Sequence, residues 1–323
     1  MSAALNRLPP LASTGVGSLP FAHAGTAAEH AVGAYELPFC PQLPRLHGDL
    51  MTEWLGADAG RCGWSPDRDR QLPAAWDAFA LALARRPPSH GLVKLQVTGP
   101  VTLAVALEHA AGRAVRVATV VELAEQISIW LAASATEQSG WLRDELGLQA
   151  LVIVDEPGLY AAGLAPEHVH VWDPLRQGTV GWGLHVCCQV PWPLIAAARP
   201  DVLSFDLVRS QVTMAAARTL RELLGGGGRI IWGALDAGGS PDPRAALRRI
   251  DTAAAAVDSG PATSLYDRSL VSATCGTGGH PVELELQVAV ALAGAASIAR
   301  GQPVPAPPAT PAAPAIAGIQ DDS

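Results

Sequence analysis

Three residues with the chemistry of soft metal ligands stand out in the chain: His185, Cys187 and Cys275. His185 and Cys187 belong to the segment LHVCCQV. If that segment is a β-strand, both side chains point to the same face, with Cα atoms roughly 6.6 Å apart. An imidazole and a thiolate at that spacing can share one ion at the usual zinc distances of about 2.0–2.3 Å. Thiolates select zinc over magnesium or calcium, so these residues predict a zinc site.

A fourth ligand is available at the end of the next strand-like segment, VLSFDL. Asp206 shares a face with Ser204 there and can offer a carboxylate. Cys275 ends the last such segment, before a glycine-rich loop that lets backbone and substrate approach closely. The competing interpretation is that the H-x-C pair is packed in a core and that Cys275 is structural. The residues alone leave both interpretations open.

Two further polar positions lie in strand-like segments. Asp155 closes LVIVDEP, where it either binds a substrate ammonium or relays a proton, or belongs to a strand-end turn with a helix cap. Lys94 alternates with apolar residues in LVKLQVT and should face a barrel interior, where a buried ammonium needs a carboxylate. We expect a structural ion pair between Lys94 and Asp155 or Glu156.

The elements that must position these residues are short β-rich segments alternating with longer helical ones. The helical segment 120–146, for example, has apolar residues at three- and four-residue spacing. Eight strand–helix units in about 300 residues indicate a single-domain α/β fold, the (β/α)8 TIM barrel. The alternative, a doubly wound open sheet, would more often show a glycine fingerprint after its first strand. The expected strands are residues 13–19, 37–43, 92–98, 150–155, 180–188, 202–207, 229–236 and 270–275.

Polar residues close nearly every one of these expected strands. In a barrel enzyme the carboxyl ends of the strands build the active site. These strand-end residues would therefore place several functional groups together at one end of the barrel. The strand-end residues are Ser18, Thr98, Asp155, His185 with Cys187, Asp206, Asp236 and Cys275.

Composition narrows the class of protein. The chain has 323 residues, a formal net charge of -8 and no dense run of lysine or arginine, which argues against nucleic acid or an anionic membrane as a partner. The longest apolar run, residues 288–299, is too short to span a bilayer. The chain has five cysteines, and its first residues do not resemble a signal peptide. We therefore expect reduced thiols and a cytoplasmic location.

We expect one folded domain. Residues 1–12 form a lead-in, residues 13–301 form the barrel, and residues 302–323 form a disordered tail rich in proline and alanine, which cannot bury a core. Hydrophobic residues make up 49% of the chain, which is ample for the core of such a barrel.

Several ordered motifs resemble the C-terminal catalytic barrel of cobalamin-independent methionine synthase, within a wider group that includes uroporphyrinogen decarboxylase. The resemblance extends from about residue 14 to residue 301, nearly the whole chain. The motifs that carry it are TGVGSLP, QVTGPVTL, VDEPGL, LHVCC, DVLSFDLVRS and ATCGTGG.

The resemblance implies a zinc-dependent methyltransferase that methylates the thiol of homocysteine to form methionine. Zinc would lower the pKa of the homocysteine thiol, and the thiolate would attack the methyl group of a donor. The implied substrate-binding residues are Val16, Ser18 and Asp155, the last holding the amino group. The implied zinc ligands are His185, Cys187, Asp206 and Cys275, with Asp206 standing where the family has the longer Glu.

The sequence departs from the family on the side of the methyl donor. The family's folate-stacking Trp would fall near Ala106, and its proton-donating His near Gly238. The chain is also too short for the family's second, N-terminal barrel. The donor is therefore either a methyl-folate or a methyl-corrinoid. Two alternatives to a methyltransferase stay open: a non-catalytic paralogue that binds zinc and a thiol, and a lyase like uroporphyrinogen decarboxylase.

Overall fold

Seven strands form one parallel sheet in the computed structural model, which describes residues 5–56, 59, 64–65, 72–177, 181–257 and 263–304. The sheet order is β1-β7-β6-β5-β4-β3-β2, so the first and last strands along the chain lie side by side. Strand residues are buried on both faces, as expected for a parallel sheet covered by crossover helices. The strands are β1 (Ala12–Ser13), β2 (Leu92–Thr98), β3 (Gln149–Asp155), β4 (Gly181–Val186), β5 (Val202–Asp206), β6 (Arg229–Leu235) and β7 (Ser269–Ala273).

An eighth extended segment, residues 37–42, lies between β1 and β2. On one side its backbone is hydrogen-bonded to β1 and to the residues that follow β1. Leu37 N donates to Ser13 O at 2.9 Å, and Gln42 N donates to Gly17 O at 3.1 Å. On the other side Cys40 N donates to Lys94 O of β2 at 3.0 Å. Parallel bridges pair Ser18 with Gln42 and Phe39 with Lys94. These bonds close the sheet into a barrel and confirm the predicted (β/α)8 fold.

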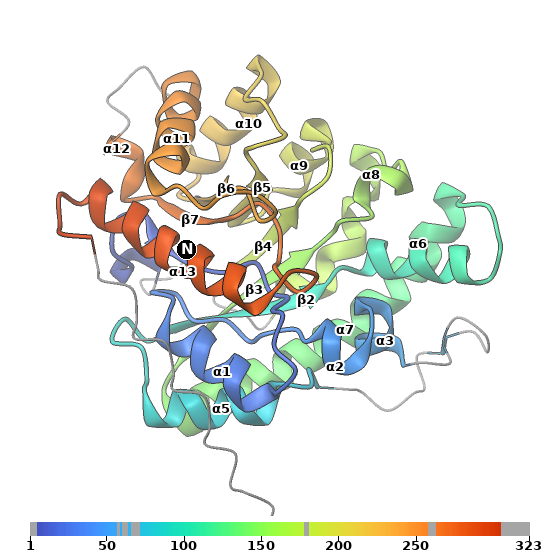
Figure 1. The fold of residues 1–323 in the computed structure, drawn as a ribbon. Coiled ribbons are helices and arrows are strands. Elements are labelled where there is room, and N and C mark those ends of the chain that lie inside the picture. Colours follow the sequence, from blue (N-terminus) through green and yellow to red (C-terminus); the bar gives the residue numbers. More distant parts are fainter. Residues whose placement is uncertain are drawn as a thin grey trace, which may run out of the picture.

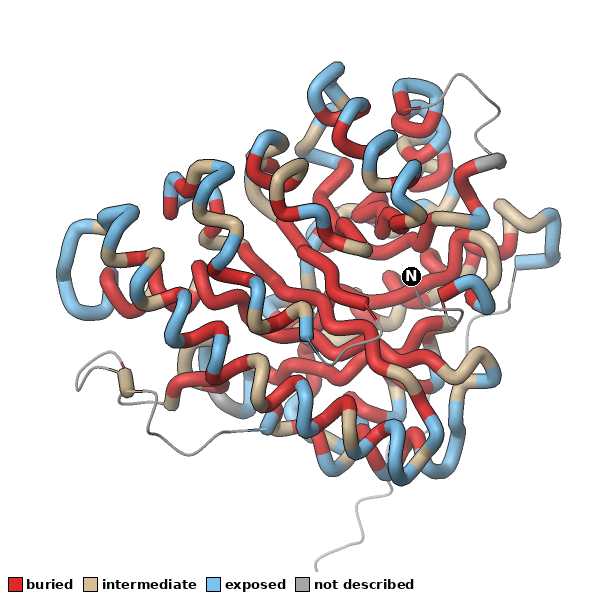
Figure 2. Tube along the Cα trace, turned by 180° about the vertical axis from the view of Figure 1, so that it is seen from behind, coloured by how far each residue is buried: buried red, intermediate tan, exposed pale blue. Residues whose placement is uncertain are grey.

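The helices surround the sheet (Figure 1) and have their exposed faces on the outside, while the strands are almost entirely buried (Figure 2). α7 packs against β2 and β3, and α13 against β7 and β1. Both are apolar enough to cross a membrane by length and composition alone, a test that core helices also pass. The helices are η1 (Leu5–Arg7), α1 (Ala24–Gly33), α2 (Pro44–His47), α3 (Leu50–Leu55), α5 (Trp76–Arg85), α6 (Pro100–Ala110), α7 (Val117–Leu146), α8 (Leu159–Ala162), η2 (Pro166–Arg176), α9 (Trp192–Ala198), α10 (Met214–Gly225), α11 (Pro243–Val257), α12 (Thr263–Tyr266) and α13 (Val282–Ala299).

The lead-in forms part of the folded domain. Leu5 and Leu8 are buried, and they belong to an apolar cluster formed with residues near the starts of strands, such as Leu92 and Leu270. The lead-in therefore packs against the amino ends of the strands, opposite the end that carries the polar residues. At the other terminus residues 302–304 are exposed, and residues 305–323 of the predicted tail lie outside the described part of the chain.

Candidate metal centre at the carboxyl ends of the strands

Three potential metal ligands converge where β3 and β4 end. Asp155 is the last residue of β3 and pairs in register with His185 of β4, and Cys187 follows β4 directly. One ligand atom from each side chain lies within 4.8 Å of the other two. Strand pairing alone thus brings a carboxylate, an imidazole and a thiol to one point, and this group could hold a metal ion.

The inner atoms of this group have no hydrogen-bond partner among the described residues. His185 Nε2 and Asp155 Oδ1 are both buried and unpartnered, and they lie 4.0 Å apart. The other ring nitrogen of His185, Nδ1, shares a 2.7 Å hydrogen bond with Ser204 Oγ on β5. A hydrogen bond of this kind is typical of metal-ligating histidines, because it fixes the ring and directs the other nitrogen toward the ion. Unpartnered buried polar atoms are costly, and a cation between them would satisfy both.

The surroundings keep the imidazole in the form that binds metals. Burial, followed by the nearby Lys94 ammonium, lowers the pKa of His185 to about 3, so the ring is neutral at physiological pH. Burial is also the main cause that raises the pKa of Asp155 well above its ordinary value, with the Cys275 thiolate adding to the effect. A buried carboxyl group of this kind ionises readily only when a cation is near.

Cys275 joins the group from the loop after β7. Its thiol shares a hydrogen bond with that of Cys187, which lowers the pKa of Cys275 to about 7 and raises the pKa of Cys187. The two thiols follow β4 and β7, far apart along the chain, and the curved sheet brings them together. The structure therefore groups His185 and Cys187 with Asp155 among the described residues, and it places Cys275 beside Cys187 at the edge of that group.

Asp206, the fourth predicted ligand, ends β5 but is engaged elsewhere. Its Oδ1 accepts hydrogen bonds from the backbone N–H groups of Val208 and Arg209 at 2.8 and 2.9 Å. It is close enough to influence the Cys275 thiol electrostatically, but it does not belong to the compact group of ligand atoms found among the described residues.

The predicted substrate-binding residues border this centre. Ser18 lies against the loop that follows Cys275, because its carbonyl accepts from Thr277 N at 2.9 Å. The approach is so close that a Cβ placed at Gly276 would lie 2.0 Å from Ser18 Oγ. The Val16 carbonyl accepts from Lys94 Nζ at 2.7 Å.

Lys94 does not form the direct ion pair that the sequence suggested. Its ammonium donates to Val16 O and, at 2.8 Å, to Gln96 Oε1, and Asp155 acts on it only through space. Burial lowers the pKa of Lys94 to about 7. The prediction failed because backbone and amide oxygens inside the barrel supply the acceptors that a carboxylate was expected to supply.

Glu156, the neighbour of Asp155, caps a helix. Its carboxylate accepts from the backbone N–H groups of Val101 and Thr102 at 3.2 and 2.8 Å, at the start of α6. Trp172 Nε1 donates to the same carboxylate at 2.9 Å. Asp155 and Glu156 thus have different roles. Asp155 faces the candidate metal centre, and Glu156 caps α6, the helix that follows β2.

A buried carboxylate that sequence reasoning missed orders the loop after β7. Glu285 on α13 accepts from Tyr35 OH and Thr277 Oγ1, both at 2.5 Å, and lies 2.8 Å from His30 Nε2. Thr277 stands two residues after Cys275 and is also bonded to Ser18. The only sequence signal was a Glu at a helical position otherwise occupied by apolar residues.

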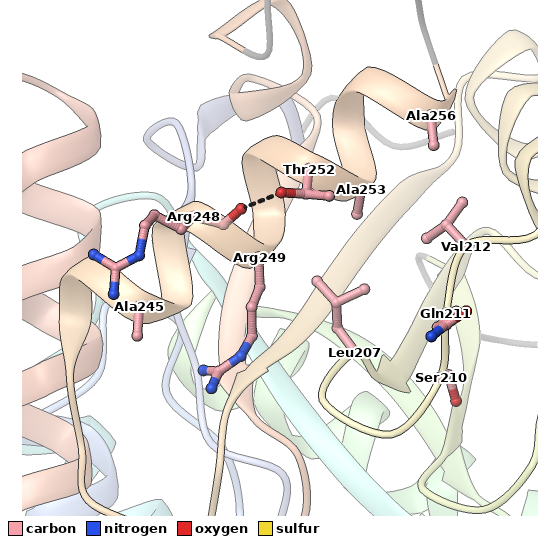
Figure 3. A pocket seen from close by; sticks show the side chains of 10 residues that line it. All are labelled: Leu207, Ser210, Gln211, Val212, Ala245, Arg248, Arg249, Thr252, Ala253 and Ala256. Atoms are coloured by element: carbon pink, nitrogen blue, oxygen red, sulfur yellow. Dashed lines mark hydrogen bonds between the residues drawn. The ribbon is translucent and has the colours of Figure 1, made fainter.

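A surface groove lies away from the candidate metal centre. It has a volume of about 570 Å³ and runs between the loop after β5 and α11 (Figure 3). Its lining includes Leu207, Val212, Arg248 and Arg249, but none of the residues of the metal centre. Arg249 is already bonded to the Ala234 carbonyl at 2.9 Å. We therefore locate the chemistry at the strand ends rather than in the groove.

Comparisons with known proteins place the fold. No protein-family model matches the sequence, and no curated protein matches it. Solved structures do match: a B12-independent methionine synthase from Shewanella sp. W3-18-1 in complex with selenomethionine has a TM-score of 0.65 at 14% identity. That match covers 90% of this chain and 98% of the other. A methyltransferase from Methanosarcina mazei has a TM-score of 0.51 at 17% identity, and the match covers 91% of this chain and 96% of the other. These likenesses establish a shared barrel fold, as the sequence motifs suggested.

Proposed function

We propose that this chain is a zinc-dependent methyltransferase that transfers a methyl group to the thiol of homocysteine, forming methionine. The observation that carries the proposal is the pair of buried, unpartnered atoms, His185 Nε2 and Asp155 Oδ1, beside the Cys187 and Cys275 thiols. A neutral imidazole with two thiols is a donor set that suits zinc. The names of both structural neighbours, a methionine synthase and a methyltransferase, agree with this chemistry.

His185, Cys187 and Cys275 would hold the ion, and a zinc ion there supplies a Lewis-acidic centre that lowers the pKa of a substrate thiol. The Val16–Ser18 segment would position the amino-acid part of the substrate. In the transfer, the substrate sulfur forms a bond to the methyl carbon, the donor–methyl bond breaks, and its electron pair stays on the donor. The protein contributes by holding the sulfur in line with that bond, which replaces a rare encounter in solution by a fixed geometry.

The donor side has one feature that the sequence did not predict. A Cβ placed at Gly238, where the family's histidine is missing, would lie 3.6 Å from Cε1 of His280. His280 comes from the loop after β7, and its side chain lies beside this position. An imidazole is thus available as a general acid for a donor with a nitrogen leaving group, such as a methyl-folate. A methyl-corrinoid needs no such acid, so His280→Gln should slow transfer from methyl-folate and leave transfer from methylcobalamin unchanged.

The test combines metal analysis with product formation. Purified protein should contain about one zinc per chain, and it should form methionine from homocysteine with methylcobalamin or a methyl-folate. Cys187→Ser should lose both the metal and the activity, whereas Cys188→Ser should keep both. The neighbouring Cys188 is a suitable control because its thiol is directed to the backbone carbonyls of Glu156 and Gln189.

Two results would overturn the proposal. Protein without zinc, even after incubation with the metal, would remove the basis of the site. Zinc-loaded protein that forms no methionine from either donor would indicate a barrel that binds zinc and a thiol without transferring a methyl group.

A further inference from the structure

Two carboxylates end strands beside the candidate metal centre, Asp155 on β3 and Asp206 on β5. The family resemblance takes the carboxylate ligand from the position of Asp206. The two side chains differ in the hydrogen bonds that their Oδ1 atoms make and in how close they lie to His185 and Cys187.

Asp206 is occupied by its own loop. Its Oδ1 accepts two backbone hydrogen bonds, from Val208 at 2.8 Å and from Arg209 at 2.9 Å, which hold the turn that follows β5. Its Oδ2 lies 3.8 Å from Nε of the exposed Arg209 side chain. Asp206 also lies outside the group of ligand atoms that come within 4.8 Å of one another, which Asp155, His185 and Cys187 form among the described residues. An aspartate is one methylene shorter than the glutamate of the family, so it stays close to its own backbone.

Asp155 Oδ1, by contrast, is buried, has no partner among the described residues and faces the equally unpartnered His185 Nε2 at 4.0 Å. Ligand atoms about 2.0–2.2 Å from a tetrahedral zinc ion are roughly 3.5 Å apart, close to the separation seen here. Because Asp155 and His185 pair in register on adjacent strands, even the short aspartate side chain reaches the imidazole.

We infer that Asp155, rather than Asp206, supplies the carboxylate ligand of the metal ion held with His185, Cys187 and Cys275. The inference rests on the proposed zinc site. It changes the role of Asp155, because an oxygen that binds the ion is not available to anchor the substrate's ammonium group. Asp206 becomes a residue that shapes the loop after β5.

The test compares two matched variants, Asp155→Asn and Asp206→Asn, each of which exchanges a carboxylate for an amide of the same size. Zinc affinity is measured by competition with a chromophoric chelator, and the ligand field from the visible absorption of the cobalt(II)-substituted protein. Asp155→Asn should weaken zinc binding by about tenfold or more, since even the loss of a residue that only orients a ligand has that effect. It should also shift the d–d bands of the cobalt protein.

Asp206→Asn should change the affinity by less than about threefold and leave the cobalt spectrum unchanged, because its role is in the turn. Asp155→Glu, which keeps a carboxylate, should retain most of the affinity and guards against misfolding of the asparagine variant. The opposite pattern, with the loss in Asp206→Asn and none in Asp155→Asn, would overturn the inference and leave the zinc site intact. Failure of wild-type protein to bind zinc would instead contradict the proposed function.

Discussion

At the scale of single residues, the candidate site depends on the orientation of the His185 imidazole. His185 Nδ1 is bonded to Ser204 on the neighbouring strand, and this bond leaves Nε2 directed toward Asp155. Ser204 shares a strand face with Asp206, which the alternation of side chains predicted. The alternation could not predict that the Ser204 hydroxyl is hydrogen-bonded to His185 Nδ1.

Removing the Ser204 hydroxyl should therefore weaken metal binding without removing a ligand. We expect Ser204→Ala to lower zinc affinity by about 10- to 100-fold, because the ring loses the partner that fixes its orientation. Ser128→Ala is the matched control, since Ser128 is a buried serine on the outer helix α7 whose hydroxyl has no described partner. Equal affinities of the two variants in chelator competition would show that the Ser204 hydroxyl does not orient the ligand.

Part of the candidate site could be predicted from the sequence, for a definite reason. His185, Cys187 and Cys275 were recognisable because residue type, two-residue spacing and strand ends are all local properties. The sequence could not show that Asp155 Oδ1 has no hydrogen-bond partner among the described residues, or that Asp206 Oδ1 accepts two backbone hydrogen bonds. The bonds of Asp206 depend on which backbone N–H groups of the turn after β5 point toward its carboxylate. Contacts between strands decide such choices, and one sequence does not reveal them.

At the scale of elements, the barrel has two irregular strands at its closure. The chain from β1 onward and the segment 37–42 were both predicted as strands, but only part of each forms regular pairs. Glycines explain the irregularity: a Cβ at Gly15 would lie 2.3 Å from the Phe39 ring, and one at Gly17 would lie 2.7 Å from Gln96 Cγ. The close approach that Gly15 and Gly17 allow brings Val16 and Ser18 to the site.

The junction of β2 and α6 depends on another close approach. A Cβ at Gly99 would lie 2.0 to 2.4 Å from the Glu156 carboxyl atoms, so an alanine would displace the group that caps α6. We expect Gly99→Ala to lower the free energy of unfolding by about 2–4 kcal/mol, from the lost cap together with steric strain. Gly25→Ala is the control, because it lies in helix α1 with open space around it and should be neutral or slightly stabilising. Urea denaturation measures both, and equal midpoints would contradict the prediction.

The loop after β7 is held by Glu285. In Glu285→Gln an NH2 group replaces one of the two acceptor oxygens and faces either the Tyr35 hydroxyl at the Oε1 position or the Thr277 hydroxyl at the Oε2 position, which should cost about 1–3 kcal/mol. Because Thr277 also ties this loop to Ser18, Cys275 should lose its position and zinc affinity should fall.

Glu283→Gln is the matched control for this prediction, since Glu283 is exposed on the same turn of α13. It should leave both stability and affinity unchanged. A Glu285→Gln variant that is less stable but binds zinc normally would show that the network supports the fold alone.

At the scale of the whole molecule, barrel closure is what assembles the site. The ligand-bearing segments follow β3, β4 and β7, and the substrate segment follows β1, so no local unit of the chain contains the site. The lead-in residues Leu5 and Leu8 pack at the opposite end of the barrel. The site should therefore depend on the stability of the whole fold. That stability is best tested with a buried group outside the candidate metal centre.

Glu53 on α3 offers such a test. It is buried, its Oε1 has no partner in the described part of the chain, and burial raises its pKa from 4.5 to about 7. The folded protein therefore binds a proton that the unfolded chain releases between these values, so this stabilising contribution is full below pH 4.5 and is lost as pH rises through 7. Glu53→Gln, which does not titrate, should match wild type near pH 4. It should become more stable than wild type by up to about 3 kcal/mol at pH 8. Denaturation of both proteins across this range measures the difference, and a constant difference at every pH would show that the Glu53 carboxyl group does not take up a proton on folding.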